Sequence, residues 1–244
     1  MKTAVVTGAS RGIGAACAVA LAKSGYNVIL GYKVNKERAE NLADVLISGY
    51  GVAAIAQKAD VSVSSEAQAL IDTAYRNFGA VDVLVNNAGI AGYKLFTDIT
   101  DEDWDEMIGT NLTGVFNCSR AAVKYMVNQK SGSIVNISSM WGQVGASCEV
   151  HYSAAKAGVI GLTQALAKEL APSGIRVNCV CPGVIKTDML NDIDDETIAS
   201  LMEETPLGRL GTPKDIADSV AFLCSDRAEF ITGQILGVNG GFII

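Results

Sequence analysis

The chain has 244 residues, of which 49% are hydrophobic and 18% charged, and its formal net charge at pH 7 is −7. This composition predicts a folded protein with a sizeable apolar core rather than a disordered chain. An acidic chain without a run of Lys or Arg repels phosphate backbones, so we expect no nucleic-acid partner. No apolar run reaches the roughly 20 residues that cross a bilayer, and no signal-peptide pattern precedes the first predicted strand. We therefore expect a cytoplasmic protein with no membrane partner.

In chain order, short apolar runs alternate with amphipathic stretches. The runs predict strands at Thr3–Thr7, Val28–Tyr32, Val52–Gln57, Val81–Asn86, Ser133–Ser138, Ile175–Val180 and Gln234–Val238. The stretches predict helices at Gly12–Ser24, Lys36–Gly49, Ser64–Phe78, Asp101–Met126, Tyr152–Ala171 and Pro213–Cys224, the fourth breaking near Gly109. Near-continuous apolar strands are typical of a parallel sheet covered by helices on both faces. The sequence thus predicts an α/β protein with one doubly wound sheet (a Rossmann fold), and the absence of a linker or repeat predicts a single domain over residues 1–244.

The cysteines and the single histidine give no metal-binding pattern. Six cysteines are present, none in a Cys-x-x-Cys pair, and His151 is the only histidine. Structural zinc needs four soft ligands at suitable spacing. The sequence therefore predicts no metal site, and free thiols in a reducing compartment.

The first predicted strand runs into a glycine-rich turn that opens the first helix. Glycines in such a turn let the backbone approach a pyrophosphate, and the helix N-terminus offers N–H groups to the phosphates. We therefore expect a dinucleotide to contact the residues of this turn, which are Gly8, Ser10, Arg11, Gly12, Ile13 and Gly14.

The end of the second strand decides which dinucleotide is used. NAD enzymes usually place Asp or Glu there, about 20 residues past the glycines, to bind the ribose 2′-hydroxyl. Here the strand ends in Tyr32 and Lys33, and no carboxylate follows until Glu37. Lys33 and Arg11 are candidates to hold a 2′-phosphate, which a carboxylate would repel. The sequence therefore predicts NADPH over NADH; the alternative is that both cations are simply solvated.

A candidate acid–base pair opens the helix expected at Tyr152–Ala171. A spacing of four places Tyr152 and Lys156 on one helical face, where the ammonium, together with an oxidised nicotinamide ring, is expected to lower the pKa of the phenol. Ser139 follows the fifth predicted strand, and its hydroxyl can donate a hydrogen bond to a substrate carbonyl. Tyr-x-x-x-Lys is common by chance, so this interpretation depends on the motifs around it.

Together, these motifs resemble those of the short-chain dehydrogenase/reductase family over the whole chain. The family's glycine motif matches Thr7–Gly14, its Asn-Asn-Ala-Gly matches Asn86–Gly89, and its serine and Tyr-x-x-x-Lys match Ser139 and Tyr152–Lys156. The resemblance implies a catalytic tetrad of Asn111, Ser139, Tyr152 and Lys156. Beyond the glycine turn, the expected NADP(H) contacts are Tyr32, Lys33, Asp60, Val61, Asn87, Ala88, Gly89, Tyr152, Lys156, Pro182, Gly183 and Thr187.

The reaction that the resemblance implies is reduction of a ketone to a secondary alcohol. NADPH supplies a hydride, and Tyr152 donates the proton to the carbonyl oxygen as general acid. Lys156 holds the nicotinamide ribose and tunes Tyr152, and Asn111 places a water that links Lys156 to solvent.

Within the family, the chain most resembles the 3-oxoacyl-[acyl-carrier-protein] reductases, which use NADPH and are usually homotetramers. The segments Arg209–Pro213, Thr232–Gln234 and Gly240–Gly241 are similar to theirs. The implied partner is an acidic acyl carrier protein, with Lys124 and Lys130 as candidate docking cations.

An alternative substrate is suggested by acidic residues around the expected cleft. The segment 187–208, which we expect to form a mobile lid, contains no Lys or Arg. Its carboxylates are Asp188, Asp192, Asp194, Asp195, Glu196, Glu203 and Glu204. They form either a solvated acidic helix or a lid that disfavours anionic partners.

The run Met140–Glu149, which joins Ser139 to Tyr152, adds to this alternative. Trp141 is either a platform for the substrate or core packing. Glu149 either caps the helix start or meets a cationic substrate group. The run resembles a reductase branch that acts on the 5-aminopentanone modification of elongation factor P, whose amine would suit these acids. A third alternative is a non-catalytic NADP-binding regulatory protein, although such proteins typically lack the tyrosine, lysine or serine.

Overall fold

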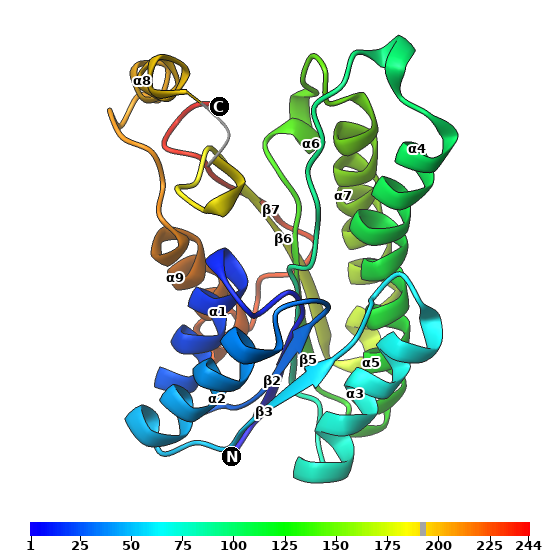
Figure 1. Ribbon diagram of the computed structural model, residues 1–244. Coiled ribbons are helices and arrows are strands. Elements are labelled where there is room, and N and C mark those ends of the chain that lie inside the picture. Colours follow the sequence, from blue (N-terminus) through cyan, green and yellow to red (C-terminus); the bar gives the residue numbers. More distant parts are fainter. Residues whose placement is uncertain (191–193) are drawn as a thin grey trace.

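The computed structural model of the chain describes residues 1–190 and 194–244. The seven predicted strands form one parallel sheet in the order β3-β2-β1-β4-β5-β6-β7. The strands are β1 (Thr3–Val6), β2 (Asn27–Tyr32), β3 (Ala54–Lys58), β4 (Val83–Asn86), β5 (Gly132–Ile137), β6 (Ile175–Pro182) and β7 (Ile235–Val238). Helices cover both faces of this sheet (Figure 1), so the predicted doubly wound α/β fold is confirmed.

The helices divide between the two faces of the sheet. They are α1 (Gly12–Lys23), α2 (Lys36–Tyr50), α3 (Ser64–Phe78), α4 (Asp101–Ile108), α5 (Gly114–Gln129), α6 (Trp141–Val144), α7 (Val150–Leu170), α8 (Asp195–Glu203) and α9 (Pro213–Cys224). Figure 1 shows α1, α2 and α9 on one face and α3, α5 and α7 on the other. Helix α8 lies at the end of the molecule toward which the strands point.

Alternation along the strands builds a core on each face. In β1, Ala4 and Val6 join the core under α1 and α9, whereas Val5 joins the core under α3 and α5. All three side chains are fully buried. Because successive side chains of a strand point to opposite faces, a strand covered on both sides must be apolar throughout. This is the physical origin of the near-continuous apolar runs in the sequence.

The structure refines several predicted boundaries. The expected break near Gly109 is a π-helical turn at Gly109–Thr113, which separates α4 from α5. Helix α2 continues through Gly49 to Tyr50, and its C-cap residue Gly51 has the left-handed φ of 67°. Helix α6 has only four residues and was not predicted, whereas α8 lies in the acidic segment for which a solvated helix was one of two expectations.

Two absences apply to the described residues alone. None of their helices combines the length and apolarity that crossing a membrane requires. No group of three or more His, Cys, Asp or Glu side chains among them is arranged to hold a metal ion.

Candidate active site

The loops that carry the predicted site residues meet at the carboxyl ends of the strands. Strand β1 pairs with β2 on one side and β4 on the other, so the chain reverses direction across the sheet at β1. Such a switch point is where doubly wound sheets bind their ligands. The residues predicted to bind the cofactor or react lie at the ends of strands or in the loops and helices that follow them, except Asn111, which lies in the π-helical turn.

The glycine turn between β1 and α1 is held against the end of β4. The backbone N–H groups of Asn87 and Ala88 both donate to Thr7 Oγ1 at 2.9 Å. The Asn87 side-chain amide donates in turn to the carbonyl oxygens of Thr7 (3.0 Å) and Gly8 (3.1 Å). Thr7 thus positions both predicted cofactor segments, a role that its place at the start of the glycine motif did not reveal.

The close approach of these two segments explains two of the glycines. Gly8 has φ of +63°, and a Cβ there would lie 2.9 Å from Ala88 Cα. A Cβ on Gly14 would lie 2.3 Å from the carbonyl oxygen of Gly8 and 2.5 Å from Asn87 Nδ2. Both positions therefore exclude any side chain.

The substitution Gly14→Ala tests this packing. We expect it to lower the free energy of unfolding by about 1–3 kcal/mol, as overpacking does, and the Tm by roughly 3–10 °C. Gly161→Ala is the matched control, because Gly161 lies in helix α7 with no heavy atom within 4 Å of an added Cβ. Thermal unfolding of both variants measures the difference, and equal Tm values would contradict the packing described here.

The start of α1 fits the diphosphate of a dinucleotide. Arg11 occupies its N-cap position without a side-chain cap, and the first turn holds no acidic residue. The first N–H groups of the helix are therefore not occupied by a capping side chain, and with the helix dipole they favour an anion. Gly8 and Gly14 keep side chains out of this approach.

Lys33, a predicted 2′-phosphate ligand, is paired with a carboxylate. Its ammonium lies 2.7 Å from Asp60 Oδ2, at the end of the neighbouring strand β3. The hydrogen bond to Asp60 raises the pKa of Lys33. Burial opposes ionisation of Asp60, but hydrogen bonds from Lys33 and Ser62 outweigh it and lower its pKa. The residues that follow β2 in sequence do not reveal this carboxylate, because the sheet brings it from the neighbouring strand β3.

Arg38 is a further cation in this region, which the sequence analysis did not name as a candidate 2′-phosphate ligand. It lies in the first turns of α2 and reaches Asp188, just after β6, with Nη1 at 3.3 Å from Oδ2. Arg11 Nη1 lies 3.1 Å from the same oxygen. The structure thus brings together Arg11 and Arg38, rather than Arg11 and Lys33, around one anionic atom.

The candidate reacting groups come together from β5 and α7. Lys156 is 4% exposed, and its ammonium donates to the carbonyl oxygen of Ile137 at 2.9 Å. It lies 5.6 Å from the centre of the Tyr152 ring. Ser138 Oγ donates to the carbonyl oxygen of Lys156 at 2.7 Å, which fastens α7 to the end of β5. Ser139 is within hydrogen-bonding reach of the Tyr152 phenol.

Burial is the main influence on the protonation of this group. Burial raises the pKa of Tyr152 to about 12, and the contact with Ser139 opposes the rise. Burial lowers the pKa of Lys156 to about 8. The ammonium alone does not lower the pKa of the phenol, because desolvation is the largest influence on Tyr152 and the ammonium is directed at Ile137. The lowering expected from the ammonium together with an oxidised nicotinamide ring stays a prediction. The phenol is neutral at pH 7 and able to donate a proton.

Asn111 is engaged by the segment that follows β4. Its Oδ1 accepts from the Ile90 N–H at 3.3 Å, and its Nδ2 donates to the Ile90 carbonyl at 3.0 Å. A Cβ on Gly89 would lie 2.6 Å from Asn111 Oδ1 and 3.5 Å from Lys156 Nζ, so Gly89 lies between these two residues. The side chain of Asn111 therefore holds the loop beside Lys156, and its predicted role in placing a water remains a prediction.

The segment between Ser139 and Tyr152 bears on two further expectations. Glu149 occupies the N-cap position of α7, as one of the two interpretations expects, but its side chain makes no capping hydrogen bond. Its backbone has φ −126° and ψ 35° rather than the β-region geometry of a typical cap, and burial raises its pKa. Trp141 packs edge-on against Phe242 with ring centres 5.9 Å apart, which gives it a packing role.

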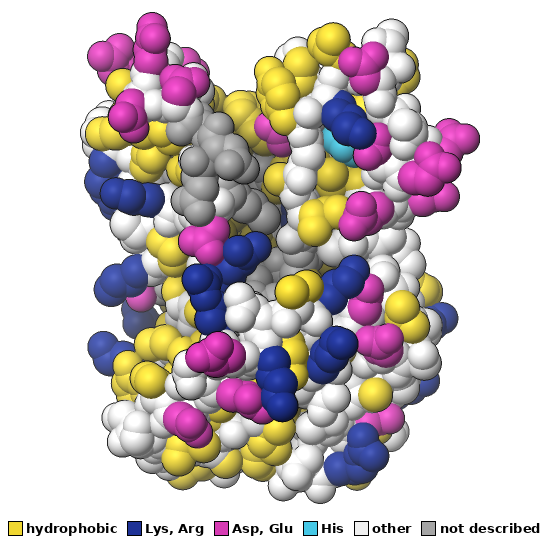
Figure 2. Space-filling model, in the orientation of Figure 1, with side chains coloured by type: hydrophobic (Ala, Val, Ile, Leu, Met, Phe, Trp, Pro, Cys, Tyr) yellow, Lys and Arg dark blue, Asp and Glu magenta, His cyan; other side chains and the backbone are white. Residues whose placement is uncertain are grey.

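The acidic segment after β6 contains helix α8. Its side chains form the acidic group over α8 in Figure 2, at the rim of the hollow that faces the viewer. Asp194 caps α8 by accepting from the Thr197 N–H at 2.8 Å. A solvated acidic helix is thus present, and the predicted lid carboxylate Asp192 lies outside the described residues.

The remaining predicted cofactor residues also lie along this edge. Tyr32 is 7% exposed at the end of β2, and Val61 is 7% exposed after β3. Pro182 ends β6, Gly183 follows it, and the Thr187 side chain would lie 3.6 Å from a Cβ on Gly12. Ser10 lies in the glycine turn, and Ile13 packs partly against the core.

Comparison with known proteins identifies relatives over almost the whole chain. A family model described as Enoyl-(Acyl carrier protein) reductase matches residues 8–243. The 3-oxoacyl-[acyl-carrier-protein] reductase FabG of Staphylococcus aureus (strain Mu50) is 48% identical over 240 residues, covering 98% of this chain and 97% of the relative. A 3-oxoacyl-[acyl-carrier-protein] reductase of Synechocystis sp. is 45% identical over 244 residues, covering 100% and 97%.

A more distant pair of matches agrees with these. The uncharacterized oxidoreductase YmfI of Bacillus subtilis is 43% identical over 241 residues, covering 99% of this chain and 98% of the relative. The solved structure of a protein from Sinorhizobium meliloti 1021, described as a short-chain alcohol dehydrogenase, superposes with a TM-score of 0.94 at 37% identity, covering 99% and 96%. These similarities confirm the resemblance read from the motifs and imply a nicotinamide cofactor. The chain belongs to the short-chain dehydrogenase/reductase family and is an oxidoreductase that acts on keto and CH–OH groups.

Proposed function

We propose that this protein is an NADPH-dependent reductase of 3-oxoacyl groups carried on acyl carrier protein. The observation that carries the proposal is the convergence of Tyr152, Ser139 and Lys156 beside Gly89, at the edge of the sheet where the glycine turn also lies. The names of relatives that are 45% and 48% identical over nearly the whole chain supply the substrate class.

The residues of the site suit proton delivery to a ketone. NADPH, when bound, supplies the hydride. Ser139 is positioned to donate a hydrogen bond to the ketone oxygen, where negative charge develops. Tyr152, whose phenol is protonated at neutral pH, delivers the proton to that oxygen. Lys156 has a pKa of about 8, near neutral pH, and can supply a proton to restore the Tyr152 phenol after each turnover.

The cationic residues support NADPH rather than NADH. No carboxylate follows directly after β2, and Arg11 and Arg38 converge on one anionic oxygen beside the glycine turn. Two guanidinium groups are well suited to a phosphate dianion. The predicted contacts from the glycine turn, Asn87–Gly89 and the segment Pro182–Thr187 complete the proposed cofactor site.

The broader setting of the enzyme is also proposed on family resemblance. We expect residues 1–244 to act as one domain and the subunits to assemble as a cytoplasmic homotetramer. All six cysteines are free thiols, which suits a reducing compartment. Lys124, on α5, and Lys130, at its C-terminal end, remain the candidate cations for docking acyl carrier protein.

A substrate panel separates the proposal from its alternatives. We expect oxidation of NADPH, followed by its absorbance, with a 3-oxoacyl thioester, and a far smaller rate with 5-amino-2-pentanone derivatives. The named relatives give no support to the elongation factor P substrate, and turnover confined to amino-ketones would overturn the proposal. A lack of turnover with every carbonyl, together with retained NADPH binding, would instead indicate a regulatory protein.

A further inference from the structure

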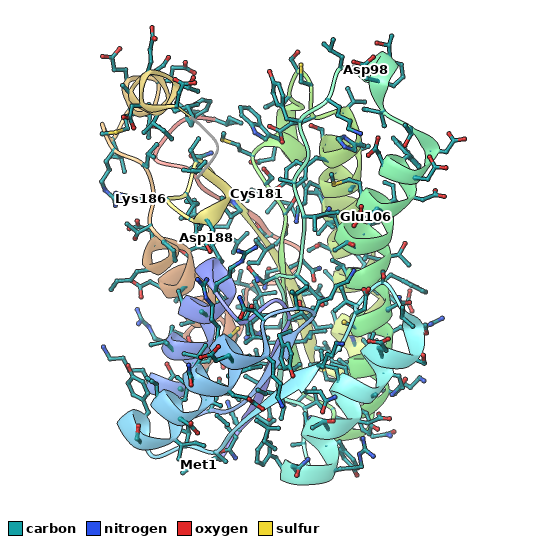
Figure 3. All side chains as sticks on the ribbon, viewed as in Figure 1. Met1, Asp98, Glu106, Cys181, Lys186 and Asp188 are labelled. Atoms are coloured by element: carbon teal, nitrogen blue, oxygen red, sulfur yellow. The ribbon has the colours of Figure 1, made fainter. Side chains whose placement is uncertain are left out.

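Three segments that are far apart in sequence meet at one carboxylate. Asp188 follows β6, Arg11 lies in the glycine turn, and Arg38 lies on α2. Both guanidinium groups approach the same oxygen, Asp188 Oδ2, at 3.1 Å and 3.3 Å. Figure 3 labels Asp188 next to the upper end of α1, on the side of the sheet where α1 and α2 lie.

This cluster is the part of the glycine-turn region where positive charge is concentrated. Lys33, the other cation near the end of β2, is already paired with Asp60 at 2.7 Å. The two arginines share a single carboxylate, so the three charged groups carry a net charge of about +1. A dianion with three oxygen acceptors would satisfy both guanidinium groups more completely than one carboxylate oxygen does.

The ion pairs of Asp188 with Arg11 and Arg38 are easily replaced by another anion. The side chains of Asp188, Arg11 and Arg38 are each about half exposed. Ion pairs at such exposure contribute little net stability because water screens them. Nothing else in the described residues accepts a hydrogen bond from either guanidinium group.

We propose that Asp188 is an internal substitute for the 2′-phosphate of NADPH, and that Arg38 joins Arg11 in binding that phosphate once Asp188 is displaced. The proposal rests on the cofactor part of the proposed function. Arg38 is then a residue that determines the choice of NADPH over NADH. Asp188 competes with the phosphate, so its charge weakens the binding of 2′-phosphorylated ligands and leaves ligands without that group unaffected.

The exchange also connects the phosphate site to the segment beside the glycine turn. Asp188 directly follows Thr187, whose side chain would contact a Cβ on Gly12 at 3.6 Å. Displacement of Asp188 therefore removes a tether between α2 and the start of the segment 187–208. By reciprocity, any ligand that draws this segment away from the arginines favours binding of the 2′-phosphate.

Calorimetric binding of two nucleotides tests the proposal without any turnover. The ligands are adenosine 2′,5′-bisphosphate, which carries the 2′-phosphate, and 5′-AMP, which lacks it. We expect Arg38→Gln to weaken the bisphosphate by about tenfold or more, as loss of a charge-assisted contact does, with little change for 5′-AMP. We expect Asp188→Asn to tighten the bisphosphate by about threefold to tenfold, again with 5′-AMP unchanged.

The double variant and a control make the test specific. Because Asp188 acts through the arginines, the gain from Asp188→Asn should shrink in the Arg38→Gln background. Asp218→Asn is the control, because it changes the net charge by the same amount as Asp188→Asn. Asp218 pairs with Lys214 within α9. Equal bisphosphate affinities for wild type and Asp188→Asn, or equal losses of both ligands in Arg38→Gln, would overturn the inference. A wild-type protein that binds both ligands equally would instead show that the cofactor part of the proposed function is wrong.

Discussion

Tyr152→Phe is expected to lower kcat for ketone reduction by roughly 10²–10⁴-fold, the usual contribution of a positioned general acid. The substitution removes the hydroxyl of a phenol whose pKa burial raises to about 12, and leaves the ring in place. NADPH binding should therefore persist within about threefold, because the glycine turn and the arginines are unchanged.

Steady-state rates and cofactor titration by fluorescence measure the two effects separately. Tyr93→Phe is the matched control, because Tyr93 lies in the loop after β4 and is 77% exposed. It should retain most of the activity. Retained turnover in Tyr152→Phe would show that another group delivers the proton.

Lys156→Met is expected to abolish most activity and to stabilise the protein at neutral pH. The buried ammonium has a pKa of about 8 in the folded chain against an ordinary value of 10.5. Below pH 8 Lys156 is protonated in both the folded and the unfolded chain, and burial of its charge costs the folded state about 3 kcal/mol. Loss of the hydrogen bond to the Ile137 carbonyl offsets about 1 kcal/mol of the gain. A net increase of about 2 kcal/mol in the free energy of unfolding at pH 7 is the result expected.

The pH dependence of this gain identifies its cause. Between pH 8 and 10.5 the unfolded wild-type chain holds more protons on this lysine than the folded chain, so wild-type stability rises with pH through that window. The advantage of Lys156→Met should therefore shrink as the pH approaches 10. Urea unfolding at pH 7 and pH 10 measures it. A variant that is less stable than wild type at pH 7, or an advantage that does not change with pH, would contradict the buried charge described here.

The fold and the identity of the reacting residues were largely predictable from sequence because both depend on local patterns. In β1, the alternation of Ala4, Val5 and Val6 between two cores is local, and so is the one-turn spacing of Tyr152 and Lys156. Connections between parallel strands are also right-handed, so a glycine turn between a strand and a helix lies at the carboxyl edge of the sheet.

The pairings across the site were not predictable, because they depend on which loops the sheet brings together. Lys33 meets Asp60, which follows β3, and Arg38 meets Asp188, which follows β6 and lies 150 residues later in the chain. The spacing of these residues in the sequence does not reveal that either pair is in contact. The protonation of Tyr152 and Lys156 escaped prediction for a related reason, since burial rather than their mutual spacing dominates both pKa values.

The decisive measurement follows the hydride from NADPH into the alcohol and compares its rate of transfer with and without the Tyr152 hydroxyl. NADPH deuterated at C4 and a 3-oxoacyl thioester are incubated with wild type and with Tyr152→Phe, and the product is analysed by mass spectrometry. We expect the wild-type product to be a 3-hydroxyacyl thioester with one deuterium on the carbinol carbon, formed at least about a hundredfold more slowly by the variant. A wild-type protein that forms no deuterated alcohol, or a variant that forms it as fast as wild type, would contradict the account.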